Sequence, residues 1–102
     1  MERIEQGDIL RISGYPYPNL VISNNYFNQN GAIIVCPILS QAELNPLHFN
    51  IETDQLNGYA LCEQVHYVNI SRRHFSKISN VDYFFMMDVS DAVMGMFDYQ
   101  TV

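Results

Sequence analysis

Positively charged side chains that could bind phosphate or carboxylate groups gather in one short stretch of the sequence. Arg72, Arg73 and Lys77 make up three of the five basic residues, and His74 lies between them. Guanidinium and ammonium groups pair with anionic oxygens through charge-assisted hydrogen bonds. The stretch could therefore contact nucleic-acid phosphates or the carboxylates of a partner, and a solvated turn is the alternative interpretation.

Histidines and tyrosines supply further side chains that suit proton transfer or stacking. His66 and His74 could act as general acid or base, because histidine titrates near neutral pH. The sequence shows no carboxylate that would orient either imidazole. Tyr15 and Tyr17 could stack on nucleobases, although tyrosines beside prolines also pack against their own domain.

The two cysteines, Cys36 and Cys62, lie within apolar stretches that are typical of strands. We expect both to be buried and reduced, because free cysteine packs as a small apolar residue and disulfides are rare in the cytosol. No Cys-x-x-Cys motif occurs, and the three histidines show no ligand spacing with either cysteine. The sequence thus predicts no metal site and no cofactor.

The overall composition predicts one acidic domain with a packed core. The chain has 102 residues, of which 48% are hydrophobic, so we expect residues 1–102 to form a single domain. The formal net charge of −6 argues against a general nucleic-acid binder but allows a small basic patch. No apolar run approaches the roughly 20 residues of a membrane-spanning helix, and the N-terminus does not resemble a signal peptide. We therefore expect a cytoplasmic location and no membrane association.

Short apolar segments separated by turn signals predict a series of strands. Four asparagines and a glycine in residues 24–31 predict a turn between two of them. Residues 32–39 are almost continuously apolar, as in a central strand, but Pro37 indicates that this strand ends there or lies at an edge. Residues 59–62 and 65–68 could form two strands or one strand with a bend. The expected strands cover residues 9–13, 20–22, 32–39, 47–51, 59–62, 65–68 and 75–78.

The last segment, residues 81–97, has the period of a helix, and Asn80 or Asp82 could be its N-cap. Its other side carries methionines, among them Met86, so the helix would pack against the strands on one side and a partner chain on the other. Strands followed by one helix predict a mostly β, α+β fold, a small barrel with a C-terminal helix. The apolar stripe consists of Val81, Phe85, Val89, Ala92 and Met96.

Several stretches resemble, in the same order, the motifs of one protein family. Residues 7–10 (Gly-Asp-Ile-Leu) resemble its Gly-Asp-Ile/Leu-Val opening, and residues 18–23 resemble its Arg-Pro-x-Val-Val strand. The closest matches are Cys-Pro-Ile-Leu-Ser-Gln at residues 36–41 and Gly-Tyr-Ala-Leu-Cys-Glu-Gln-Val at residues 58–65. Over about residues 7–97 the sequence resembles the MazF/PemK toxins of type II toxin–antitoxin systems.

This resemblance implies an SH3-like small barrel, a homodimer, and metal-independent cleavage of single-stranded RNA that a cognate antitoxin silences. In that reaction the ribose 2′-hydroxyl attacks phosphorus, and charge develops on the phosphoryl oxygens. The family uses an arginine before its second strand and a threonine at the end of its third. Here those positions hold Tyr17, which has no permanent positive charge, and Leu39, which cannot form a hydrogen bond. The loop at residues 14–18 is also shorter than in the nucleases, so ordinary ribonuclease activity is not expected.

Other side chains could take over part of the site. Ser40, beside Leu39, could offer a hydroxyl in a shifted register, and Glu63 matches the acidic position of the family's Asp/Glu-Gln-Val motif. Glu63 could instead tie strand ends to neighbouring backbone donors. The candidate catalytic residues are Glu63, Arg72 and Arg73. The candidate substrate-binding residues are Tyr15, Tyr17, Ser40 and His66.

Two functions remain open at this point. The chain could be a MazF/PemK-type endoribonuclease with a rearranged site. It could also be a non-catalytic relative that binds a protein, as a CcdB-like gyrase inhibitor or as an antitoxin- or partner-binding module. The acidity and the missing arginine favour binding over cutting. The partners that the resemblance implies are a cognate antitoxin, single-stranded RNA or a protein target, and a second copy of the chain.

Overall fold

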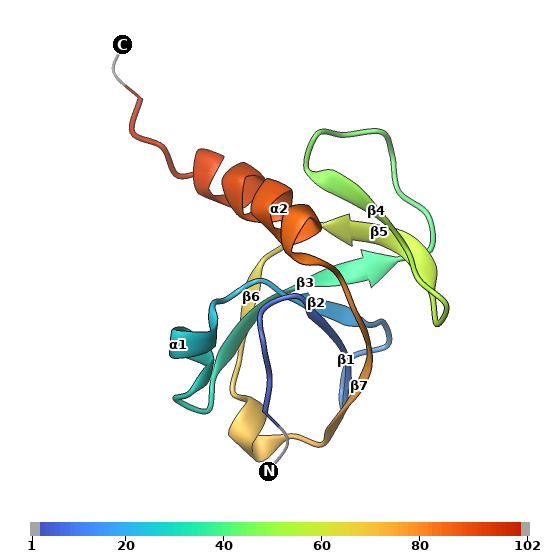
Figure 1. Ribbon diagram of the computed structural model, residues 1–102, viewed down its shortest axis with the longest axis vertical. Coiled ribbons are helices and arrows are strands. Elements are labelled where there is room, and N and C mark those ends of the chain that lie inside the picture. Colours follow the sequence, from blue (N-terminus) through green and yellow to red (C-terminus); the bar gives the residue numbers. More distant parts are fainter. Residues whose placement is uncertain (1–2, 101–102) are drawn as a thin grey trace.

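Seven strands and one long helix form the framework of residues 3–100, the part of the chain that the computed structural model describes. The strands curl into a half-barrel, and the C-terminal helix α2 lies along its side (Figure 1). No helix in this described part is both long and apolar enough to cross a bilayer. The elements are β1 (Asp8–Ile12), β2 (Asn19–Val21), α1 (Asn25–Asn28), β3 (Ile33–Leu39), β4 (His48–Glu52), β5 (Asn57–Leu61), β6 (His66–Val68), the 3-10 turn η1 (Ile70–Arg72), β7 (Phe75–Asn80) and α2 (Tyr83–Gly95).

All strand pairs are antiparallel, and the order along the sheet is β4-β5-β3-β2-β1-β7. Strand β3 lies at the centre, with β2 along one edge and both β6 and β5 along the other. The predicted mostly β, α+β fold, an SH3-like small barrel with a C-terminal helix, is confirmed as this curled half-barrel. The segment at residues 62–65 joins β5 to β6, so the two strands are separate elements.

Pro37 does not end β3, and the prediction that the strand stops there or lies at an edge is wrong. Strand β3 continues to Leu39, and Pro37 is fully buried opposite Asn19 of β2. On its other edge, β3 pairs with β6 as far as Val35 and with β5 from Ile38 onward. Pro37 therefore lies in the gap where β3 changes neighbours, a position where the missing N–H leaves no ladder bond unmade.

Two hydrophobic clusters fill the protein. One contains Ile9, Cys36, Ile51 and Val89, so it joins β1, β3 and β4 to α2. The other contains residues of β1, β2, β3 and β6, with Tyr15 and Phe75 packed against it. Burying a side chain the size of valine or isoleucine stabilises the fold by about 1.5–3 kcal/mol. These two clusters thus hold together the strands whose ends carry the connecting loops.

Cys36 and Cys62 are buried free thiols, as predicted. Both belong to the cluster that includes α2. Their shared hydrogen bond, together with burial, raises the pKa of Cys36 well above its ordinary value. The same hydrogen bond lowers the pKa of Cys62.

Helix α2 is shorter than the predicted residues 81–97, and it is rotated relative to the predicted stripe. Asp82 is the N-cap, and its carboxylate accepts a hydrogen bond from the backbone N–H of Phe85 at 2.8 Å. Val89 is fully buried, as expected, but Met86 is only 5% exposed and packs toward Gly7. The prediction that Met86 lies on the outer side is wrong, because the face that packs on the half-barrel includes Met86, Val89 and Val93.

The asparagine-rich segment also differs from the predicted turn. It contains the short helix α1, which Asn24 caps by accepting a hydrogen bond from the N–H of Phe27 at 2.8 Å. Asparagine favours both turns and N-caps for the same reason, since its side chain mimics a backbone acceptor. Composition alone therefore did not separate the two structures.

Candidate functional site

The turn between β1 and β2 places Tyr15 and Tyr17 against β6 and the segment after it. The ring centroids of Tyr15 and His66 are 5.4 Å apart, and those of Tyr15 and Tyr17 are 6.4 Å apart. The guanidinium carbon of Arg73 lies 5.1 Å from the centroid of the Tyr15 ring, over its face. This geometry is a cation–π contact. Four of the predicted site residues thus meet at one surface.

Gly14 allows the turn to approach Arg73 closely. Its φ is +94°, and a Cβ atom there would lie 2.7 Å from Nη1 of Arg73. That nitrogen donates a hydrogen bond to the carbonyl of Ser13 at 2.9 Å, and the N–H of Ser13 donates to the carbonyl of His74 at 2.9 Å. The end of β1 is therefore tied to the segment after η1, which fixes Tyr15 beneath the arginine.

A hollow of about 460 Å³ opens beside this contact, and Tyr15, Tyr67, Arg72, Arg73 and His74 are among its lining residues. Tyr67 is 61% exposed, and within residues 3–100 the exposed Arg72 guanidinium forms no ion pair. Cations bind phosphates and exposed rings stack on bases, which are the two recurring parts of single-stranded nucleic-acid sites. We call Tyr15, Tyr17, His66, Arg72 and Arg73 the arginine face.

His66 has one ring nitrogen engaged and one free. Nδ1 lies 3.4 Å from the carbonyl oxygen of Gln64. Because a carbonyl only accepts, the contact requires the proton on Nδ1. Nε2 is buried and has no hydrogen-bond partner among the described residues. The Nε2 atom of His66 is therefore not accessible to a ligand in this conformation.

Glu63 lies in a different environment, bound to a histidine of β4. Nε2 of His48 donates to a carboxylate oxygen of Glu63 at 2.8 Å, and Nδ1 of His48 lies 2.7 Å from the carbonyl oxygen of Glu43. Carboxylate and carbonyl oxygens only accept, so a histidine that donates to both carries both protons. We call His48 and Glu63 the histidine clamp, because it ties β4 to the segment between β5 and β6.

The pKa shifts of the histidine clamp agree with this geometry. The hydrogen bond to Glu63, followed by that to the Glu43 carbonyl, raises the pKa of His48 above its ordinary value. Burial alone would raise the pKa of Glu63, but the hydrogen bonds from His48 and from its own backbone N–H leave that pKa lowered. The hydrogen bonds of the clamp thus favour the charged form of each group over its neutral form.

At the two positions where the resemblance implies catalytic residues, this chain has Tyr17 in place of an arginine and Leu39 in place of a threonine. Tyr17 is half-buried beside Tyr15. Leu39 is half-buried at the end of β3 and pairs with Tyr59 of β5. Ser40 follows it, is exposed, and forms no side-chain hydrogen bond within residues 3–100. The structure therefore brings Tyr15, Tyr17, His66, Arg72 and Arg73 together, and it places Glu63 with His48 instead.

Sequence reasoning missed two residues of these regions. His48 is the hydrogen-bond partner of Glu63. The register of the β4–β5 hairpin could have revealed it, because His48 pairs with Leu61 and Glu63 comes two residues later. Tyr67 lines the hollow, but it lies in an apolar segment for which the sequence predicts only a strand. Its place between half-buried His66 and buried Val68 would have put it on the outer face of an alternating strand.

Comparisons with known proteins agree on one family. The sequence model of the "PemK-like, MazF-like toxin of type II toxin-antitoxin system" family matches residues 8–97. A MazE–MazF crystal structure from Deinococcus radiodurans superposes with a TM-score of 0.86 at 16% identity, covering 95% of this chain and 98% of that chain. An endoribonuclease from a mycobacterial species gives a TM-score of 0.80 at 17% identity, covering 95% and 93%. The same kind of endoribonuclease in complex with its cognate antitoxin gives 0.76 at 17% identity, covering 91% and 96%.

A search of curated protein sequences found no match. At 16–17% identity, the structural likeness establishes the fold. The family match carries further, because it spans most of the chain and includes β1, β3, β5 and α2. From its sequence and its fold together, the chain belongs to the PemK-like, MazF-like toxins of type II toxin–antitoxin systems.

Proposed function

We propose that this chain is a toxin-family protein that binds single-stranded RNA on the arginine face and cleaves it far more slowly than an ordinary MazF. The observation that supports binding is the hollow of about 460 Å³, in which two arginines and two exposed or half-exposed tyrosines lie side by side. A guanidinium can bind a phosphate with two parallel hydrogen bonds. A tyrosine ring can stack on any base, so recognition there would be tolerant of sequence.

We expect slow cleavage because Tyr17 and Leu39 replace the arginine and the threonine that the resemblance implies. Removing one donor that stabilises an oxyanion typically costs about 10²–10³ in rate. Losing a general acid or base costs about 10²–10⁴, and the two losses need not multiply, because catalytic groups act as a unit. The histidine clamp offers no substitute while its two members neutralise each other. Arg72 and Arg73 are the residues that would carry any remaining activity, and Glu63→Ala tests whether the clamp contributes to it.

A cognate antitoxin, a cytoplasmic location and a homodimer belong to the same proposal. The mycobacterial endoribonuclease was solved with its cognate antitoxin, which supports a similar partner for this chain. Small closed homodimers are the most common oligomers of soluble proteins, which supports a homodimer for this chain.

A second candidate function is the binding of a protein target without RNA chemistry. The net charge of −6 weakens any RNA affinity that depends on charge. The exposed apolar residues of α2 favour a protein partner instead. The two candidates differ in whether RNA is bound at the arginine face, so one pair of assays separates them.

The test is a sequencing-based cleavage assay on long RNA without metal, with an ordinary MazF as the reference and growth on expression as a second readout. We expect cleavage at least about 100-fold slower than the reference. Arg72→Ala and Glu63→Ala are run beside the parent chain. Brisk cutting that either substitution abolishes would refute slow cleavage and place the chemistry at that residue. Growth arrest without RNA cutting or RNA binding would favour the protein target.

A further inference from the structure

Helix α2 presents a second apolar face, directly opposite the one that packs on the half-barrel. Phe84, Met87 and Met94 are 74%, 44% and 67% exposed. Their spacing of three and seven residues places them on one side of the helix. Buried Val89 lies on the other side. A monomer gains nothing from exposing these three large side chains in a row.

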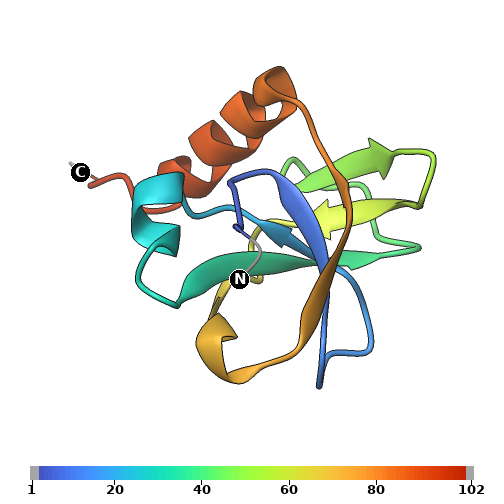
Figure 2. The ribbon, with the colours of Figure 1, turned by 60° about the horizontal axis from the view of Figure 1, so that its bottom comes forward.

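The exposed face continues into a groove of about 290 Å³ between α1 and the C-terminal half of α2. Figure 2 shows α1 beside that end of α2. Ile22, Phe27, Val93 and Met94 form the apolar part of the lining. The polar part comes from uncharged side chains, Gln6, Ser23, Asn24 and Ser90. An apolar segment could lie along the helix and place one side chain in this groove.

The charges around this face have a single sign. Asp88 and Asp91 lie among its apolar residues and are exposed. Residues 81–100 contain four aspartates and no lysine or arginine. Two copies of this face related by a two-fold axis would bring aspartates toward aspartates, which is unfavourable at an interface. The complementary surface is therefore apolar with positive charges at its edges, and it belongs to a different chain.

We propose that the outer face of α2, with the groove beside α1, binds an amphipathic segment of a partner protein that carries lysine or arginine beside its apolar anchors. The anchors would be spaced by one turn of helix to match Phe84, Met87 and Met94. The positive side chains would pair with Asp88 and Asp91. This surface shares no residue with the arginine face, so the proposal goes beyond the RNA function and stands if that function fails.

The test uses two synthetic fluorescent peptides of about 20 residues with the same leucines at helical spacing. One has lysines beside the leucines and the other has glutamates at the same positions. Titration of the full chain by anisotropy should give an affinity for the lysine peptide at least about tenfold higher, and Asp91→Lys should remove most of that difference. Asp54→Lys, at an exposed position in the turn after β4, changes the net charge equally and should leave most of it. Phe84→Ser should weaken binding of the lysine peptide several-fold.

Three results would overturn the proposal. Equal affinity for the two peptides would remove the charge argument. An equal effect of Asp54→Lys and Asp91→Lys would mean that only the total charge of the protein matters. Light scattering that shows a dimer for the parent chain and a monomer for Phe84→Ser would identify a second copy of this chain as the occupant of the face.

Discussion

The histidine clamp and the arginine face contain similar kinds of side chain, yet they differ in how their charges are used. In the clamp, both nitrogens of His48 face acceptor oxygens at 2.7–2.8 Å, and the Glu63 carboxylate accepts one of these bonds. On the arginine face, Arg73 has one bond to a backbone carbonyl, and Arg72 has no ion pair within residues 3–100. In the clamp, the two opposite charges neutralise each other at the surface of the chain, whereas the arginine face keeps positive charge for a ligand. The charged groups of the clamp thus have a structural role, whereas the arginines of the other region remain available to bind a ligand.

Among the substitutions that would test this comparison, Gly14→Ala should have the largest effect on stability and on the position of Arg73. A residue with a Cβ atom at φ +94° is strained, and the added atom would meet Arg73 at 2.7 Å. We expect the free energy of unfolding to fall by about 1–2 kcal/mol, as measured by urea denaturation. Arg73 should also lose its place over Tyr15. Gly95→Ala is the matched control, because nothing lies within 4 Å of a Cβ atom there. Equal effects of both substitutions would contradict the role given to Gly14.

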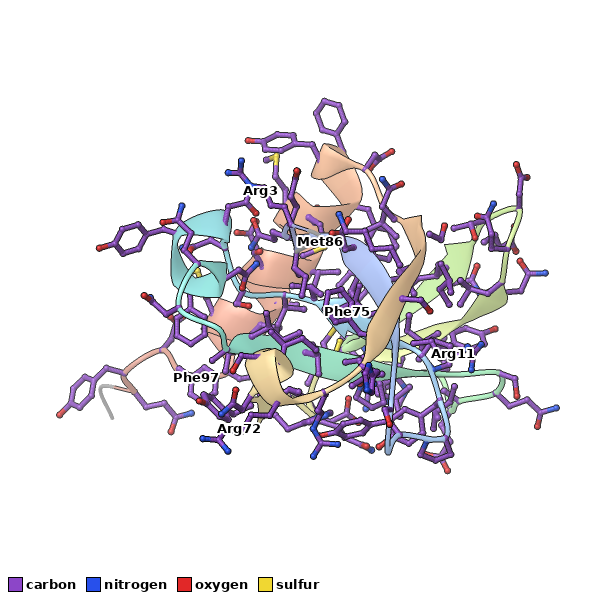
Figure 3. All side chains as sticks on the ribbon, turned by 90° about the horizontal axis from the view of Figure 1, so that it is seen from below. Arg3, Arg11, Arg72, Phe75, Met86 and Phe97 are labelled. Carbon is purple, nitrogen blue, oxygen red and sulfur yellow. The ribbon has the colours of Figure 1, made fainter. Side chains whose placement is uncertain are left out.

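A smaller effect should follow from Arg72→Ala, which removes the unpaired cation of the arginine face. We expect the affinity for a labelled 12-nucleotide single-stranded RNA to fall about fivefold, with a shallower dependence on salt. Fluorescence anisotropy at two salt concentrations measures both quantities. Arg11→Ala is the control, since Arg11 is exposed on β1 and lies on a separate flank from Arg72 (Figure 3). The same loss from both variants would show that binding depends on net charge and not on the face.

The smallest effect should be the pH dependence that the histidine clamp adds to stability. The pKa of His48 is raised above 6.5, so its contribution is full below that pH and is lost as the pH rises through the raised pKa. The pKa of Glu63 is lowered below 4.5, so its contribution is full above that pH and is lost as the pH falls through the lowered pKa. The clamp therefore stabilises the fold most between about pH 4.5 and 6.5.

His48→Gln tests this window by thermal unfolding. We expect Tm to drop by at most about 4 °C near pH 5.5, and the difference from the parent chain should shrink above neutral pH. His74→Gln changes an exposed histidine outside the clamp and should show no such trend. A constant difference for His48→Gln from pH 5 to pH 9 would mean that shape, not charge, explains the contact.

The sequence predicted the elements well where hydrophobic periodicity was strong. The strands, the helix, the Asp82 cap and the two buried cysteines all follow from local patterns. Met86, Pro37 and α1 differ from the predictions because tertiary packing determines them. The rotation of α2, the gap between β5 and β6, and the choice between a turn and a capped helix are not set by local sequence. The assignment of residues 1–102 to one domain stays a prediction.

The candidate site divides in the same way. Tyr15, Tyr17, Arg72 and Arg73 were recognisable from residue type, and the β1–β2 turn then brought them together with His66. The partner of Glu63 could not be read from type alone, because His48 is 15 residues away and is reached only through the register of a hairpin. The catalytic and substrate-binding roles of these residues stay predictions that the variants above would test.

The two buried cysteines can report how often the core around them opens. Cys36 and Cys62 are both 0% exposed, one on β3 and one just after β5. A thiol-specific reagent can reach them only when this part of the core opens, so the labelling rate reports how often the opening occurs. Mass spectrometry of labelled chains would count openings without any engineered dye. Comparing those rates with and without RNA or a peptide would show which ligand binds only the closed half-barrel, because such a ligand slows labelling by mass action.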